Sequence, residues 1–455
     1  MPRRILLGAA SALMILAASP VAAQTVATRL SLRDALRIAD SRSYANRGAA
    51  AVTDAAHAQA NGAMRGILPS VSTEAGVIRT TDPIGAFGFA LKQRSVSAAS
   101  FAPALLNDPA GITNFGTALV FEQPLVNADA WMGLKSARAA ADAAASGARW
   151  TATSVHGNVV QAYFGAIVAG ELASAMREAE RSALEHVRSA ELALANGFVT
   201  RSDVLLARVR AGDVTAQRLE AESRLRLARA SLATLLGVPA DTAVSLPESV
   251  PSPSDVISLI AQPAAAGARE DVLAARGAQR AAQLDLRRSQ GSLLPRINGF
   301  ARYDWNSPSR FGGGSPAWTA GAVASWSVFG GGRELADMSG AAARLRGAEA
   351  QAEGAEAAAE LDRRAADEAL SVAIARAAIA DTAVLQSSEA LRIVRRKYDG
   401  GLSVVSELLD AAAAETTAHV MRARSRFDVL VAAADRLRAW GADPAALAAL
   451  DIDLR

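Results

Sequence analysis

Residues 409–437 read LDAAAAETTAHVMRARSRFDVLVAAADRL, and this stretch decides the fold. Apolar or small side chains recur in it at alternating intervals of four and three residues, at Leu409, Ala413, Thr416, Val420, Ala423, Phe427, Leu430, Ala434 and Leu437. A period of 3.5 residues sustained over four heptads is typical of helices that pack as coiled coils. Ordinary amphipathic packing is the alternative, but its period drifts toward 3.6 residues, so we favour the coiled coil.

The helical pattern around this stretch is very long. Tracts of roughly 67 residues, 130–196 and 333–399, are each followed by a Gly-containing break and a shorter helix, 202–236 and 404–440. A helix of that length spans about 100 Å, at 1.5 Å per residue. No globular core is that long, so only other helices laid along it can cover it. The sequence therefore predicts a long tube or rod.

The chain carries one structural plan twice. Gly66-Ile67-Leu68-Pro69 recurs as Ser292-Leu293-Leu294-Pro295, and Asn196-Gly197-Phe198 resembles Gly400-Gly401-Leu402, which lies 204 residues further on. Each copy has a first helix (about 31–66 and 268–292), two strands and a helical hairpin. The first copy carries about 22 extra residues in a Pro/Gly/Ser-rich stretch near 82–116, for which we expect a loop.

This repeat divides the chain into segments. The first repeat is 24–237, with a β-hairpin at 67–127 and a helical hairpin whose turn lies near 197–201. A Pro-rich linker covers 238–267. The second repeat is 268–455, with a β-hairpin at 294–330, a turn near 400–403 and a C-terminal segment.

The N-terminus has the pattern of an export signal. Arg3 and Arg4 precede an uncharged apolar stretch, residues 5–18, and Val21-Ala22-Ala23 places small residues before a cleavage site at Gln24. Residues 1–23 are therefore predicted to be a signal peptide. No later segment has the composition of a membrane helix, since the nearest, 150–170, contains His156, Asn158 and other polar residues. Any entry into a membrane is therefore expected to use β-strands.

The strand-like runs have the alternation of membrane barrel strands. Asn298, Arg302 and Asp304 alternate with Ile297, Gly299, Ala301, Tyr303 and Trp305, although Phe300 breaks the pattern. In the following run Trp318, Ala320, Ala322, Ala324, Trp326 and Val328 share one face. This pattern predicts one face toward lipid and one toward water. Four strands per chain cannot close a barrel, because the smallest single-chain examples have about eight. Several chains must share one barrel, and the strand pattern alone leaves two or three copies open.

Composition excludes several classes of function. The 455 residues are 51% hydrophobic but only 5% aromatic, and the 48 basic and 45 acidic residues nearly balance, which does not indicate a nucleic-acid binder. There is no Cys, so disulfides, thiolate metal sites and an N-terminal lipid on Cys are excluded. The four histidines fall in no metal or catalytic motif, and no phosphate-binding loop is present. We therefore expect neither an enzyme nor a cofactor.

The chain resembles the TolC-type outer-membrane efflux proteins (outer membrane factors). Five segments in order carry the resemblance: 30–39, 159–164, 269–275 followed by Leu293-Leu294-Pro295, 326–333 and 398–410. It departs from the family at Glu270, where a proline is expected, and near Tyr44, where a proline is absent.

The resemblance implies an α+β membrane protein. Long coiled-coil helices would form a periplasmic α-barrel, and four strands from each of three chains would form a 12-stranded β-barrel in contact with outer-membrane lipid. It implies a passive exit duct in the outer membrane of a Gram-negative bacterium. Its partners would be a periplasmic adaptor and an inner-membrane transporter, in a tripartite efflux pump or a type I secretion system. The alternative is a periplasmic coiled-coil scaffold or adaptor without a pore.

The resemblance also places functional residues at the two turns. Those matching the periplasmic gate are Ser202, Asp203, Tyr398, Glu407 and Asp410, and those matching the adaptor-docking turns are Gly197, Phe198, Gly401, Leu402 and Ser403. Rings of carboxylates at a constriction favour cations. Acids early in a helix also suit its dipole, which leaves the two roles of Asp203 open and favours the gate for Asp410. Ser403 stands where the family has a gate arginine.

Overall fold

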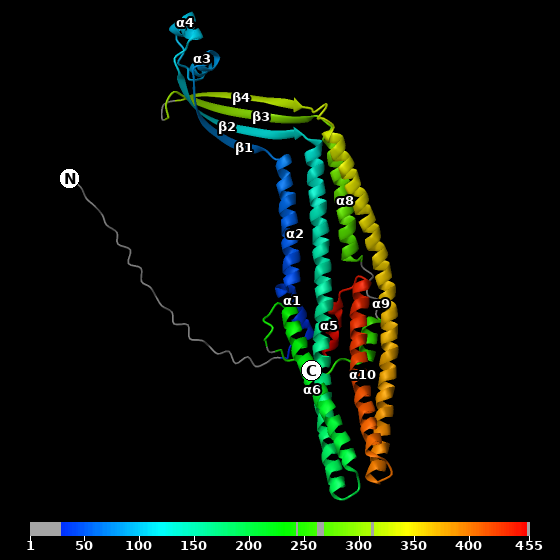
Figure 1. Cartoon of the computed structure of the whole chain (residues 1–455). Coiled ribbons are helices and arrows are strands. Elements are labelled where there is room, and N and C mark those ends of the chain that lie inside the picture. The colour runs from blue at the N-terminus through cyan, green and yellow to red at the C-terminus, as the bar shows by residue number, and fades with distance from the viewer. Residues whose placement is uncertain (1–28, 243, 262–267, 311–313, 453–455) are drawn as a thin grey trace, which may run out of the picture.

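The computed structural model describes residues 29–242, 244–261, 268–310 and 314–452. The predicted signal peptide, 1–23, and part of the linker, 262–267, lie outside this range. Figure 1 shows a long rod of helices with a four-stranded sheet at one end. The predicted combination of long helices and four strands is confirmed.

The elements follow the duplicated order. The helices are α1 (Leu32–Arg42), α2 (Tyr44–Ala63), α3 (Pro83–Lys92), α4 (Pro103–Asn107), α5 (Ala128–Ala195), α6 (Arg201–Leu235), α7 (Pro253–Ile260), α8 (Glu270–Gly291), α9 (Arg333–Asp399) and α10 (Val405–Ala439). The strands are β1 (Ser70–Thr80), β2 (Ile112–Val126), β3 (Arg296–Ser307) and β4 (Ser315–Ser325). Short 3-10 helices are η1 (Met64–Gly66), η2 (Ala98–Phe101) and η3 (Pro444–Ile452).

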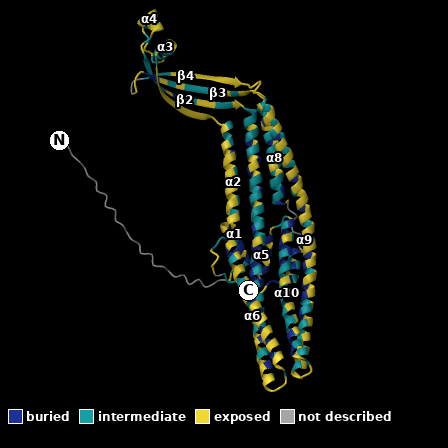
Figure 2. Ribbon diagram, in the orientation of Figure 1, coloured by how far each residue is buried: buried dark blue, intermediate teal, exposed yellow. Residues whose placement is uncertain are grey.

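The shorter helices cover the long ones. Along α5, α2 and α8 pack on the half near the sheet, and α6 and α10 pack on the other half; α9 is covered by α8 and then by α10 (Figure 1). None of the nine positions of the 3.5-residue repeat in α10 is exposed, and Leu409, Leu430, Ala434 and Leu437 are buried (Figure 2). The predicted seam therefore faces the interior, with four of its nine positions buried and five partly buried.

The single helix predicted at 31–66 is wrong, because the chain breaks at Ser43. The backbone of Ser43 is extended (φ −53°, ψ 132°), and it separates α1 from α2 without a proline. The carbonyl of Ala39 accepts a hydrogen bond from the N–H of Ser43 (3.0 Å), and the Nδ2 group of Asn46 donates to the same carbonyl, 3.3 Å away, which joins the start of α2 to the end of α1. The break allows the buried face of α1 to reach the core while α2 follows α5.

The main core lies midway along the rod. Tyr163 and Phe164 of α5 are fully buried together with Leu32 of α1, Val256 of α7 and Leu447 of η3. By length and composition, α5 is the one helix among the described residues that could cross a membrane, but half of its apolar window is buried in the protein. The apolar character of residues 150–170 is thus explained by core packing.

The four strands form one antiparallel sheet in the order β1-β2-β3-β4. Tyr303 pairs with Leu119 on one side and with Trp318 on the other, so the apolar residues of the strands share a face, as predicted. On the opposite face, Arg302 forms ion pairs with Glu74 and Asp304, each 2.9 Å long. The sheet therefore has an apolar face and a charged, water-compatible face.

The stretch 82–116 is more than the loop we expected. Asp82 accepts a hydrogen bond from the N–H of Gly85 (2.6 Å), and Pro83 occupies the first turn, so α3 has a well-capped start. The rings of Phe87 and Phe101 pack edge to face with centroids 5.6 Å apart. These contacts make the insert between β1 and β2 a small folded unit.

Candidate functional site

The two helical hairpins turn back at the end of the rod away from the sheet (Figure 1). Gly197 and Gly401 have φ of 73° and 72°, a left-handed conformation that glycine adopts without steric cost. The N–H of Phe198 donates to the carbonyl of Ala193 (2.9 Å), and the N–H of Leu402 donates to that of Lys397 (2.8 Å). Both long helices therefore end in the same Schellman motif, 204 residues apart.

The residue after each of these glycines projects into solvent. The side chains of Phe198 and Leu402 are 83% and 82% exposed. In a Schellman motif this residue commonly packs back on its own helix, which neither residue does here. The five predicted docking residues thus lie on two neighbouring turns with two protruding apolar side chains, and their docking role stays a prediction.

Asp203 is engaged at the start of its own helix. Its carboxylate accepts hydrogen bonds from the N–H and the hydroxyl of Thr200, both 2.8 Å long, while the Asp203 N–H donates to the Thr200 hydroxyl (3.3 Å). This capping box lowers the pKa of Asp203, chiefly through the bond from the Thr200 N–H. Of the two roles left open for Asp203, the geometry shows the cap. Ser202 lies beside it and is exposed.

Tyr398 connects the two turns electrostatically. It lies in the last turn of α9, and burial raises the pKa of its hydroxyl; the carboxylates of Asp203 and Asp399 raise it further. Asp203 belongs to the first hairpin and Tyr398 to the second. Two predicted gate residues from different repeats are therefore brought close enough to interact.

The acids of the second turn differ in their contacts. Glu407 accepts a hydrogen bond from the hydroxyl of Ser403, the residue at the family's arginine position. This bond joins two side chains at the start of α10, where the N-cap residue is Val404. Asp410 is exposed and makes no ion pair within the described part of the chain. Since residues three apart share a helix face, Glu407 and Asp410 present two carboxylates on one side of α10.

Sequence reasoning missed the ion cluster in the middle of the rod. His156 of α5 lies between Asp40 of α1 and Asp443, which precedes η3. These residues are 116 and 287 positions from His156, so no spacing signal could have joined them. Among the described residues, no group of His, Cys, Asp and Glu has the arrangement of a metal site.

The departure at Glu270 leaves the helix start intact. α8 begins at Glu270 without a proline, and the Nε of Arg149 donates to the Glu270 carboxylate, 2.8 Å away. The preceding Arg269 is buried and forms ion pairs with Asp271 (2.7 Å) and Asp362 (3.0 Å).

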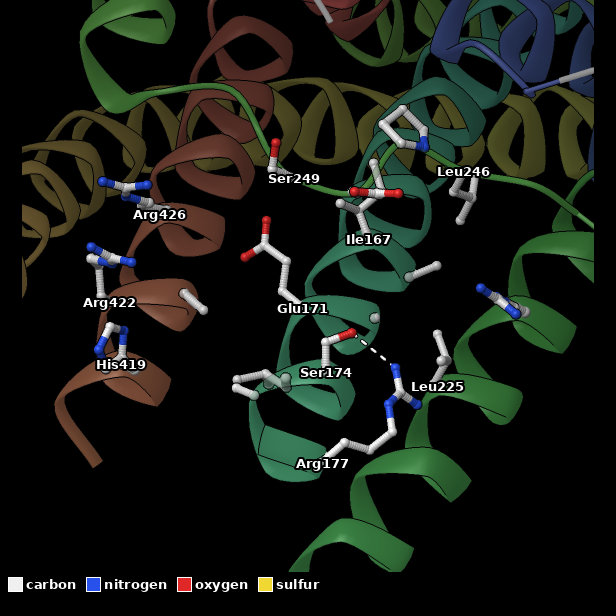
Figure 3. Close-up of a pocket in the computed structure, with 18 residues that line it drawn as sticks. Ile167, Glu171, Ser174, Arg177, Leu225, Leu246, Ser249, His419, Arg422 and Arg426 are labelled. Carbon is white, nitrogen blue, oxygen red and sulfur yellow. Dashed lines mark hydrogen bonds between the residues drawn. The ribbon is translucent and has the colours of Figure 1, made fainter. Parts of the chain in front are cut away.

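A cavity of about 580 Å³ lies between α5, α6 and α10 under the linker (Figure 3). Glu171 accepts a hydrogen bond from the N–H of Val250 (2.9 Å), and burial raises the pKa of its carboxyl against the effect of that bond and of Arg426 and Arg422. Nearby, Arg177 donates to the hydroxyl of Ser174 (2.9 Å). The bond between Val250 and Glu171 joins the linker to α5.

Comparison with known proteins agrees with this architecture. The solved structure of the outer membrane protein VceC from Vibrio cholerae is 19% identical, with a TM-score of 0.75 over 90% of this chain and 96% of that chain. The CmeC outer membrane channel of Campylobacter jejuni is 17% identical (TM-score 0.74, 90% and 85% covered). The open state of the MtrE outer membrane channel of Neisseria gonorrhoeae is 20% identical (TM-score 0.73, 91% and 89% covered).

At these identities the structures establish the fold. A search of curated proteins found no match. The sequence itself matches the family described as outer membrane efflux protein over residues 35–238 and 262–442, which is most of its length and includes both repeats. The chain therefore belongs to the outer membrane efflux protein family, whose members are passive conduits of the outer membrane with a long periplasmic part, and it is not an enzyme.

Proposed function

We propose that this efflux channel is the exit duct of a tripartite pump or of a type I secretion system. Three copies would share one 12-stranded barrel and one helical tunnel. The turns at Gly197 and Gly401 would dock to a periplasmic adaptor, which links the duct to an inner-membrane transporter. Energy would come from that transporter.

The observation that carries this proposal is the open sheet. β1 and β4 are its two edges, and among the described residues each is paired on one side only. In lipid an unpaired strand edge costs several kcal/mol per unsatisfied backbone group, so membrane sheets close into barrels. Because four strands are too few for closure, β1 of one copy is expected to pair with β4 of the next.

The helices also have uncovered apolar faces. Exposed side chains line α6 and α9, at Leu205, Leu206, Val209, Leu219, Leu227, Leu361, Val372, Ile379 and Leu385. α9 packs on α8 and α10, and α6 packs mainly on α5, which leaves these side chains exposed in the described part of the chain. Neighbouring copies would cover them, because large exposed apolar areas mark interaction surfaces.

The gate would lie at the closed ends of the hairpins. Asp203, Glu407 and Asp410 of each copy would form carboxylate rings there, and Ser202 and Tyr398 would lie beside them. Such rings at a constriction favour the passage of cations. Because Ser403 stands at the family's arginine position and donates to Glu407, the closed state would lack the arginine latch that the resemblance implies for the family.

Reconstitution in a planar bilayer tests the proposal. We expect detergent-purified protein to form discrete conducting channels that favour cations. Absence of conductance, together with release of the protein from membranes by alkali, would support the scaffold alternative instead.

A further inference from the structure

The insert between β1 and β2 is anchored to both β2 and β4. Gln93, directly after α3, donates from Nε2 to the carbonyl of Thr113 (2.8 Å) and to Oδ1 of Asn114 (3.0 Å), both in β2. The hydroxyl of Ser315, at the start of β4, donates to the carbonyl of Gln93 (3.3 Å). Since β3 lies between β2 and β4, the insert crosses one face of the sheet at this end.

The face that it crosses is the charged one. Along β3, Arg302, Asp304 and Asn306 are two residues apart, so their side chains lie on the same face. Ser315 of β4 pairs with Asn306 and therefore lies on that face too. Asn114 donates to Asn306 (2.8 Å), and the two are only 4% and 6% exposed on a sheet that is otherwise largely exposed. In a barrel, the charged face lines the water-filled interior. The insert therefore lies inside the mouth at the end away from the helices.

The insert presents large apolar side chains that remain mostly exposed within the described part of the chain. Ile84 is 85% exposed, and Phe101 and Leu105 are each more than half exposed. The segment that carries them is folded, through the helix cap at Asp82 and the packing of Phe87 on Phe101. Apolar side chains held together on a folded surface segment indicate a surface that another chain covers.

We propose that the inserts of the three copies meet over the barrel mouth and form a lid at the cell surface, so that the partner of this apolar surface is a second copy of the same insert. The proposal rests on the shared barrel proposed above. In a barrel with three-fold symmetry, elements on the interior face of each wall approach the common axis, and the apolar residues of three folded inserts then cover one another. The contacts of Gln93 hold each insert in this position.

Cysteine cross-linking tests the lid cleanly, because the chain has no Cys. We expect Ile84→Cys, treated in outer membranes with a short bismaleimide, to give covalent dimers with the third copy left as monomer. The mass of the same particle in detergent is measured in parallel. If no dimer is cross-linked although the particle has the mass of three chains, the lid is contradicted and the shared barrel stands. If the particle has the mass of one chain, the shared barrel itself is contradicted.

A matched pair of variants tests the anchor. Gln93→Ala, added to Ile84→Cys, is expected to slow cross-linking several-fold, whereas Lys92→Ala is expected to leave the rate unchanged, because Lys92 is exposed and forms no ion pair among the described residues. A second readout uses Thr319→Cys, on the charged face of β4, which the lid would shield from a bulky polyethylene-glycol maleimide added outside. Adding Gln93→Ala to this variant is expected to speed the labelling of the cysteine. Equal rates with and without Gln93 contradict the anchored lid.

Discussion

The Nδ1 of His156 lies 2.8 Å from the carboxylate of Asp443, which joins the middle of α5 to the C-terminal segment. On the other side of the ring, Nε2 lies 2.6 Å from Asp40. Only the charged imidazolium can donate from both nitrogens. The pKa of His156 is raised to about 9. The hydrogen bond with Asp443 raises it most strongly, burial of the ring lowers it, and the hydrogen bond with Asp40 raises it further. One protonated ring therefore holds three segments that are distant in the sequence.

This cluster predicts a loss of stability at alkaline pH. The pKa of His156 is higher in the folded chain than its ordinary 6.5, so its contribution is complete below about pH 6.5 and is lost as the pH rises through 9. Because the two carboxylates are half exposed, we expect the protonated ring to contribute only about 1–2 kcal/mol to the free energy of unfolding. The measurement is the thermal unfolding midpoint in detergent from pH 6 to about pH 10, the window that this pKa shift defines.

The matched variants are His156→Gln and His57→Gln. His156→Gln should be less stable at pH 6 and lose the alkaline decline, whereas His57→Gln, at an exposed position in α2, should behave as the unaltered protein. The same alkaline decline in His156→Gln and in the unaltered protein would show that another group titrates.

Replacing glycine by alanine is expected to destabilise the turns but to stabilise the interior of a helix. A Cβ at Gly197 or Gly401 meets no atom within 4 Å, so Ala there is disfavoured by the positive φ alone, at about 1 kcal/mol. Gly212 also has open space, but it lies inside α6, where Ala is expected to stabilise by up to about 1 kcal/mol. Thermal unfolding and hydrogen exchange at the turns measure this. Equal effects of Gly197→Ala and Gly212→Ala would contradict the account of the turns.

Local patterns explain how much of this structure the sequence reveals. The seam of α10, the hairpin turns and the two faces of the sheet follow from periods of 3.5 and 2 residues and from paired glycines, which need no tertiary information. The cap by Asp203 was also readable, because Thr200 three residues before an acid is a capping signal. The break at Ser43, the fold of the insert and the cluster at His156 depend on contacts between distant segments. Periodicity within a segment carries no information about such contacts, so the sequence pattern could not predict them.

Asp410 is the clearest test of the proposed gate. Because it is exposed and has no ion pair in the described structure, Asp410→Asn should lower the cation selectivity of the channel in a bilayer. Asp435→Asn, near the other end of α10, where the carboxylate pairs with Arg438, is the control and should leave selectivity unchanged. Reversal potentials in a salt gradient that are the same for all three proteins would remove Asp410 from the gate.

Replacement of Arg269, which lies far from the turns, is expected to lower the stability of the chain. Its side chain is only 4% exposed, it pairs with Asp271 and Asp362, and its guanidinium lies 4.9 Å from the ring centroid of Trp150. Arg269→Met should destabilise the chain by about 2–3 kcal/mol, because it leaves a partly buried carboxylate without a partner.

The control for Arg269 is an exposed arginine within α8, the helix that Arg269 precedes. Arg276→Met, which removes a pair with Glu356, should cost less than about 1 kcal/mol. Urea unfolding followed by tryptophan fluorescence compares the two, and similar losses for both variants would contradict the structural role of Arg269.

The central claim is that one chain is an incomplete pore and that three chains complete it. The most direct measurement is the protein mass of the particle extracted from outer membranes in detergent, together with its mobility in mild SDS without heating. The account predicts a particle of three chains that survives this treatment. A single chain, released from the membrane without detergent, would contradict it.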